Sequence, residues 1–454
     1  MQRAKRNDSS KTLQRIDFKW NRNITQLHQR DQMRRFYSLL FLSLICCTLN
    51  IYAQSVDTET KIFYPDFKTL KVQVADDFLA PPIIHLNSNE QIIITFDEIS
   101  DDVRYMQYRL VHCNADWQPS QLLDSEIVDG FNIANIDDYA FSSNTFIHYV
   151  NYLIAIPNQD IKPLVSGNFL LQVFPENDPD DIILQARFCI DEAKVEVSGE
   201  ATSRTDLGYN DIYQQVNFKI DQKNYSIRDP YNDIIAVVEQ NGRNDNKAIV
   251  GHPQRVLGSE IYYEHIPQLI FKAGNEFRRF ETVRANYPGM NVDSTRYIDD
   301  SYNAYLKIDE PRANQSYYYD QTQYGRYMID EYNSTDPNLG ADYIMTHFSL
   351  DLPYVMNADI YIDGELSNHN FSDENKMVYN YGTNLYEKTM RLKQGSYNYQ
   401  YLAIPRNGDK IGDPTLVEGN YYETINEYVI KIYQRQPGSR ADRLIGSYTI
   451  YSGK

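Results

Sequence analysis

Few side chains in this sequence have the types and spacing that chemistry requires. Beyond residue 60 there is no G-x-S-x-G nucleophile elbow, no phosphate-binding loop, no H-E-x-x-H zinc motif and no C-x-x-C pair. The histidines are scattered singly, and only His112, followed by Cys113 and Asp116, belongs to a local polar cluster, whose spacing fits no known metal site. Adjacent strand residues point to opposite faces, so His112 is poorly placed to activate the Cys113 thiol.

Carboxylates are the plentiful reactive group, because the chain has 62 Asp and Glu residues. Two carboxylates can hydrolyse a glycosidic bond, but no pair is set apart by its surroundings. A glycoside hydrolase therefore ranks last among the function classes. We predict that the protein is not an enzyme and that it binds no metal and no cofactor.

Two cysteines, Cys113 and Cys189, lie in the body of the chain, since Cys46 and Cys47 fall in an apparent export segment. Each of the first two follows a strand-like stretch, RLVH and QARF. An exported chain meets an oxidising compartment, which permits one disulfide between them. Two independent buried thiols are the alternative, and the sequence leaves both open.

The export segment has the pattern of a secretory signal peptide at residues 33–53. Arg34 and Arg35 precede an apolar run at 36–49, and the small residue Ala53 ends the segment. The run is shorter than the about 20 residues of a membrane-spanning helix. We therefore expect cleavage near Ala53 and an exported protein that does not span the membrane.

The residues before this segment are unusual for the start of a signal peptide. Residues 1–32 are polar and basic, and Met33 directly precedes the two arginines. We expect Met33, rather than Met1, to be the true start and residues 1–32 to be an upstream misannotation.

Charge and aromatic content narrow the choice of partner. The chain has a formal net charge of −18 although its first residues are basic, so the body is strongly acidic and repels phosphate backbones. Nucleic acid is thus excluded as a partner. The chain has 39 Tyr against 19 Phe and 2 Trp, and tyrosine favours both half-buried strand positions and recognition surfaces.

Hydrophobic residues follow a period of two rather than 3.6 beyond residue 60, and Gly, Pro, Asn and Asp turns separate the short runs. This pattern predicts an all-β protein made of tandem Ig-like β-sandwich domains. The clearest strand segments are 68–74, 91–96, 105–111, 168–174, 214–220 and 234–240.

Turn-rich stretches divide the body into units. We predict one β-sandwich at 57–195, a second at 196–312 and an Ig-like C-terminal sandwich at 341–454. Between the last two lies a tyrosine-rich connector at 313–340, which we expect to be partly ordered because disordered linkers usually lack aromatic residues.

Four residues are candidates for contact with a partner. Trp117 stands beside Asp116 and Pro119 at a strand end, where it suits a recognition anchor or, alternatively, a core residue that closes one end of the sandwich. Arg278, Arg279 and Arg284 are clustered in an otherwise acidic body, where they suit docking of an acidic partner or the balance of local acids.

Several long stretches resemble the plug protein family of the Bacteroidetes type IX secretion system. They are LAPPIIHL, the segment from YRLVHCNADWQPS to VDGFN, AGNEFRRFETVRANYPGMNV, and the segment from VEGNYYETINEY to RADRLIG. The resemblance covers about residues 60–450. It implies a periplasmic protein, peripheral to the inner face of the outer membrane, that plugs the translocon channel and meets other secretion-system subunits. It implies no catalytic residues.

The segment 358–404 is similar to the glycogen-binding, Ig-like modules of starch-active enzymes. Both have a strand into a DG turn and a strand with alternating tyrosines, here after Gly395. The likeness implies an alternative function, a periplasmic carbohydrate-binding protein, with His369, Phe371 and Tyr399 as the candidate sugar contacts. Those modules stack sugars on tryptophans, and this segment has none, so we expect the fold to be shared and the sugar binding to be lost.

Overall fold

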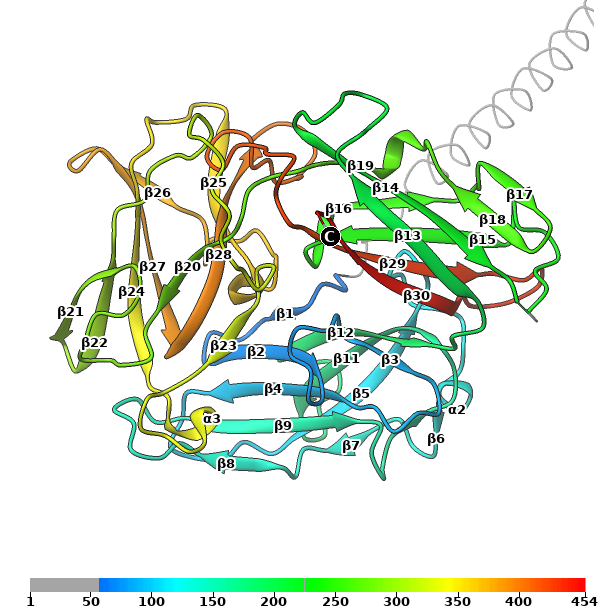
Figure 1. The fold of residues 1–454 in the computed structure, drawn as a ribbon. Helices are drawn as coiled ribbons and strands as arrows, with labels where there is room; N and C mark the ends of the chain where they lie inside the picture. Colours follow the sequence, from blue (N-terminus) through cyan, green and yellow to red (C-terminus); the bar gives the residue numbers. More distant parts are fainter. Residues whose placement is uncertain (1–56, 224, 454) are drawn as a thin grey trace, which may run out of the picture. The chain divides into compact units, whose positions relative to one another are not determined.

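Strands dominate residues 57–223 and 225–453, the part of the chain that this computed structural model describes. All six segments with a two-residue period form strands, and β5 (Met106–Cys113), for example, buries every second side chain. The predicted all-β class with tandem sandwiches is confirmed (Figure 1). The signal peptide predicted at 33–53 and the extension at 1–32 lie outside the described residues.

The first sandwich packs two sheets face to face around a core that includes Phe67, Phe96, Tyr152 and Phe169. One sheet has the order β1-β12-β11-β5-β7, with β3 parallel to β12, and the other has the order β2-β4-β9-β8. A two-stranded sheet of β6 and β10 and the helical turn α2 complete it. The bounds are β1 (Lys61–Ile62), β2 (Phe67–Val74), β3 (Ile83–His85), β4 (Ile92–Glu98), α2 (Asp124–Ile127), β6 (Val128–Asp129), β7 (Ala134–Asn135), β8 (Tyr139–Phe141), β9 (Val150–Ile156), β10 (Lys162–Pro163), β11 (Gly167–Pro175) and β12 (Leu184–Asp191).

The second sandwich is built from two parts of the chain. Its first sheet has the order β13-β14-β18-β17, with β19 also on β14, and its second sheet has the order β16-β15-β29-β30. Val216 and Phe218 of one sheet meet Ala236 and Ile430 of the other in one core. The bounds are β13 (Glu196–Thr202), β14 (Tyr213–Asp221), β15 (Ile234–Gln240), β16 (Arg243–Val250), β17 (Arg255–Leu257), β18 (Glu260–Tyr263), η1 (Pro267–Leu269), β19 (Ile270–Lys272), β29 (Glu427–Gln434) and β30 (Arg443–Tyr451).

The third sandwich packs the sheet β21-β22-β24-β27-β26 against a sheet in which β28 pairs with β20, β23 and β25. The alternating residues Tyr397, Tyr399 and Tyr401 of β28 all enter this core, as their spacing predicts. The bounds are β20 (Arg278–Glu281), β21 (Val292–Ile298), β22 (Ser301–Leu306), β23 (Tyr327–Ile329), α3 (Pro337–Gly340), β24 (Tyr343–Leu350), β25 (Ala358–Asp363), η2 (Glu365–Ser367), β26 (Val378–Asn380), β27 (Leu385–Lys393) and β28 (Gly395–Pro405).

Strand pairing corrects the boundaries predicted at 196–312 and 341–454. β29 and β30 extend the sheet of β15 in the second sandwich, while β20 and β22 pair with β28 and β24 of the third. The third sandwich is therefore inserted into the second, between β19 and β29. Sheet pairing joins residues far apart in the sequence, so boundaries drawn at turn-rich stretches do not reveal it.

The tyrosine-rich connector predicted at 313–340 contains one strand and one helical turn. β23 pairs with β28, and the Asp336 carboxylate caps α3 by accepting the Asn338 amide. Its tyrosines also make ring contacts with the returning chain, since Tyr317 lies 5.8 Å from Tyr421 between ring centroids. Part of the connector thus belongs to the third sandwich.

Both body cysteines are free and buried, so they are two independent thiols rather than a disulfide. Cys113 on β5 and Cys189 on β12 flank the same residue, Asn168 of the intervening strand β11. Two strand spacings amount to about 9–10 Å, beyond the about 7 Å that a disulfide spans between Cα atoms.

Candidate interaction surface

Trp117 lies inside the molecule, where the first and second sandwiches meet. It is only 4% exposed and belongs to a cluster with Leu170 of the first sandwich and Tyr433 of the second. The Arg187 guanidinium lies 4.2 Å from the centre of its ring. The prediction of a surface anchor is thus corrected, because burial leaves the core alternative. We call this contact the Trp117 joint.

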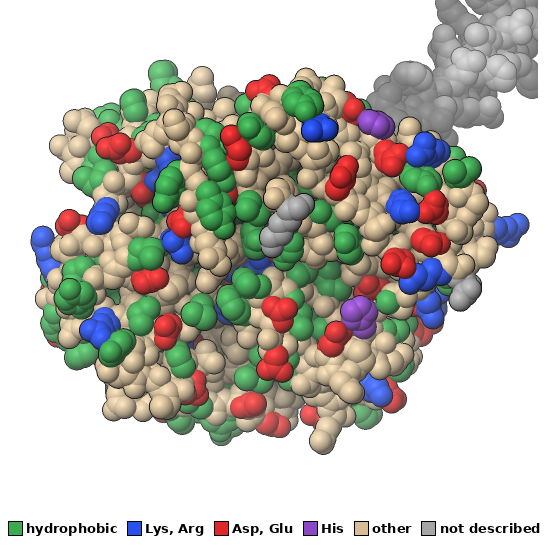
Figure 2. Space-filling view, in the orientation of Figure 1, with side chains coloured by type: hydrophobic (Ala, Val, Ile, Leu, Met, Phe, Trp, Pro, Cys, Tyr) green, Lys and Arg blue, Asp and Glu red, His purple; other side chains and the backbone are tan. Residues whose placement is uncertain are grey.

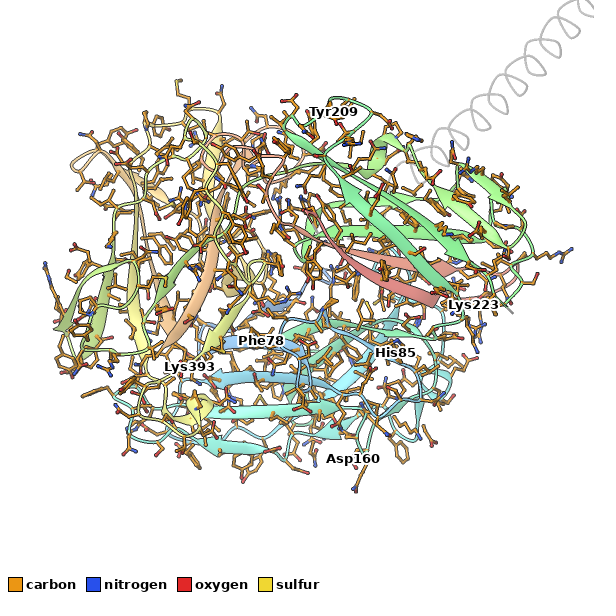
Figure 3. The ribbon with its side chains drawn as sticks, viewed as in Figure 1. Phe78, His85, Asp160, Tyr209, Lys223 and Lys393 are labelled. Carbon is orange, nitrogen blue, oxygen red and sulfur yellow. The ribbon has the colours of Figure 1, made fainter. Side chains whose placement is uncertain are left out.

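A second buried contact joins the first and third sandwiches, and we call it the Lys393 joint. The Lys393 ammonium donates to Asp97 at 2.7 Å, and both side chains are 1% exposed. Figure 3 places Lys393 where the third sandwich meets the first. The Tyr343 hydroxyl also donates to Asp97, and the Tyr149 ring lies 4.0 Å from the ammonium. Burial lowers the pKa of Lys393, and the Asp97 charge opposes that shift.

A third buried group, the Glu418 network, ties the loop after β28 to the core of the third sandwich. The Glu418 carboxylate is fully buried and accepts from Arg278 and Arg312. Arg278 also pairs with Asp309 at 2.7 Å. Burial alone would raise the pKa of Glu418, but the two guanidinium groups outweigh it and lower that pKa to about 2. Arg278 is therefore committed to internal ion pairs.

The other two predicted arginines retain exposed surface. Arg279 makes a two-pronged contact with Asp320 of the connector and is half-buried. Arg284 is exposed, lies 3.5 Å from the centre of the Tyr332 ring, and has no carboxylate partner among the described residues. Arg284 is thus the predicted contact residue whose donors are most available.

Arg284 lines a cleft of about 780 Å³ between the first and third sandwiches, which we call the Arg284 cleft. Three rings border it: Phe146 from the first sandwich, and Tyr302 and Tyr332 from the third-sandwich part of the chain. Phe146 and Tyr332 are 60% and 63% exposed. Figure 2 shows one face of the molecule, on which hydrophobic, acidic and basic side chains are interspersed.

The three residues predicted to contact sugar do not share an exposed surface. Tyr399 is 2% exposed, and its hydroxyl donates to Asp309. Phe371 packs edge-on against Tyr361, and His369 lies 3.1 Å from Asp363. Tyr399 thus serves the core of the third sandwich.

The polar cluster around His112 is likewise structural. His112 is buried against Phe169, its Nε2 lies 3.0 Å from the Ser166 carbonyl oxygen, and burial lowers its pKa. Burial raises the pKa of the Cys113 thiol to about 12 and that of Cys189 to about 11. Both thiols stay protonated at neutral pH, which suits packing rather than nucleophilic chemistry.

Residues 67–192, most of the first sandwich, match the family model of the first domain of the type 9 secretion system plug protein. This chain resembles the plug protein family over that domain. A crystal structure of a hypothetical protein from Parabacteroides merdae is 41% identical to it, with a TM-score of 0.86, and the alignment covers 87% of this chain and 100% of that chain.

The other comparisons bring little further evidence on the family of this chain. A Pseudomonas fluorescens alkylpurine DNA glycosylase aligns at 10% identity over 28% of this chain and 30% of that chain, with a TM-score of 0.18. No curated protein matches the chain. The likeness of 358–404 to glycogen-binding modules finds no counterpart here and stays a prediction.

The match of residues 67–192 to the plug-protein domain supports a role related to type IX secretion, association with components of that system and a periplasmic location. Together with the all-β fold, it indicates a structural rather than an enzymatic role. Within the described ranges, no helix is long and apolar enough to cross a bilayer.

Proposed function

We propose that this protein is the plug subunit that seals the periplasmic opening of the outer-membrane type IX channel by steric occlusion. The match of residues 67–192 to the plug-protein domain supports the assignment. On this proposal, the protein is exported by a signal peptide cleaved near Ala53 and acts at the inner face of the outer membrane.

The observation that carries the proposal is the burial of charged and aromatic side chains at the joints within residues 57–454, which form one compact unit. A protein can occlude a channel only if its domains, here the three sandwiches, keep fixed positions relative to one another. The Trp117 joint fixes the second sandwich to the first, and the Lys393 joint fixes the third. Opening the Lys393 joint would expose or unpair buried charges, which costs several kcal/mol.

The contact with the channel must be weaker than these joints, because the plug has to leave when cargo engages. A surface with interspersed hydrophobic and charged side chains provides specific contacts of moderate strength. Cargo that favours the open channel then shifts the equilibrium toward release. Of the predicted contact residues, Arg279 and Arg284 retain exposed surface for this contact.

Co-purification tests the partner directly. We expect the tagged protein to retain the outer-membrane channel, and retention to fall when the channel is occupied by cargo. Failure of the tagged protein to retain the channel under every condition of salt and cargo occupancy would contradict the proposal.

A further inference from the structure

The Arg284 cleft carries charges of both signs, and their arrangement argues for a neutral ligand. Glu331, Asp336 and Asp342 line it beside Arg284. Three carboxylates against one guanidinium repel an anionic ligand. A cationic ligand would find the Tyr332 ring already covered by Arg284 at 3.5 Å, and carboxylates that already accept hydrogen bonds from backbone amides.

The cleft carboxylates are also committed to the protein's own backbone. Asp342 accepts the amides of Phe146, Ile147 and Tyr343, and Asp336 accepts the Asn338 amide. Glu331 accepts the Asn333 amide at 2.7 Å. These bonds hold the three carboxylates in fixed positions. The groups that remain available to a ligand are therefore mainly neutral donors and acceptors, together with Arg284.

Those neutral groups and the rings suit one class of ligand. Exposed amides and hydroxyls border the cleft at Asn144, Asn286, Asn333 and Thr335. Phe146 and Tyr332 present apolar rings from opposite sandwiches. A sugar ring has an apolar C–H face, which packs on an aromatic ring, and an edge of hydroxyls, which bonds to amides and carboxylates.

We propose that the Arg284 cleft binds a neutral oligosaccharide. Its volume of about 780 Å³ falls in the range of small-ligand sites. The ligand would stack a ring face on Phe146, contact the exposed part of the Tyr332 ring that Arg284 does not cover, and turn its hydroxyls toward the asparagines and Arg284. This site differs from the buried Tyr399, and the proposal does not rest on the plug function.

A glycan array probed with the full chain tests the proposal. The array carries neutral oligosaccharides, including N-acetylglucosamine oligomers, together with acidic glycans and neutral and acidic peptides. We expect retention of neutral oligosaccharides, and at least tenfold weaker binding for Phe146→Ala and Tyr332→Ala. Tyr332→Phe keeps the ring and should retain most of the affinity.

Tyr381→Ala is the matched control, because this tyrosine is 73% exposed on the third sandwich outside the cleft and should leave binding unchanged. Circular dichroism should show that each variant is folded. Phe146 and Tyr332 are both exposed, so replacing either ring should leave the core intact. Retention of peptides or acidic glycans alone, retention of nothing, or equal binding by Tyr332→Ala would overturn the proposal. Any of these results leaves the plug function standing.

Discussion

At the scale of single residues, Trp117 is buried and Arg278 is nearly so, whereas Arg284 is exposed and lines a cleft. Trp117 and Arg278 were selected for their rarity and charge, and both are enclosed by chain segments distant in sequence. Arg284 was selected by the same criterion and is exposed. Burial depends on tertiary contacts, so one sequence does not separate these cases. Phe146 and Tyr332 carry no motif that would have revealed the cleft.

Glu418 should make the free energy of unfolding depend on pH in the acid range. Its pKa falls from 4.5 to about 2 on folding, so its contribution is fully present above pH 4.5 and is lost as the pH falls through 2. The shift corresponds to roughly 3 kcal/mol. We expect Glu418→Gln to lower the free energy of unfolding at pH 7 by about this amount and to flatten its decline between pH 4.5 and 2, as measured by urea denaturation.

The exposed Glu374 provides the control, since Glu374→Gln removes a carboxylate that lies at the surface. Its stability should follow the wild type across the whole pH range. An unchanged acid dependence in Glu418→Gln would show that the buried network does not hold this carboxylate ionised.

At the scale of elements, the two-residue period located the strands well. Alternate residues of a strand face the core and the solvent, so neighbouring residues alone carry the pattern. Pairing partners were not predictable in this way. β29 resembles any other apolar strand in sequence, yet it lies between β15 and β30 in the second sandwich. The predicted units were therefore contiguous, whereas the third sandwich is inserted into the second.

Removing the C-terminal hairpin should damage the second sandwich rather than the third. A chain that ends at residue 426 lacks β29 and β30, which exposes the edge of β15 and the core around Ala236. We expect limited proteolysis to cut within residues 196–272 while 278–405 stays protected. A chain that ends at Tyr451 keeps both strands and should resist cleavage throughout. Preferential cleavage in 278–405 would contradict the inserted arrangement.

At the scale of the whole molecule, the joints matter more than any one sandwich. Each brings together side chains from different sandwiches, and such pairs leave no local pattern in the sequence. The Lys393 joint is the clearest example, because Asp97 and Lys393 are far apart in the chain and both are buried. Family resemblance predicted the plug role, whereas only the structure reveals how the sandwiches are held together.

Lys393→Met should weaken the contact between the first and third sandwiches, because the Asp97 charge then stays buried without its cation. Removing one partner of a buried pair typically costs about 3–5 kcal/mol. We expect faster amide hydrogen exchange in β27 and β4, and partial recovery when Asp97→Asn removes the remaining charge. Exchange equal to that of the wild type would show that the joint does not hold the sandwiches together.

The central claim is that this protein seals the secretion channel, and envelope leakage tests it most directly. In a strain that lacks the gene, uptake of a large antibiotic or dye that the outer membrane normally excludes should rise. The wild-type gene should restore the barrier, and the Lys393→Met gene should restore it less well. An unchanged barrier in the deletion strain, with the channel present, would contradict the plug function.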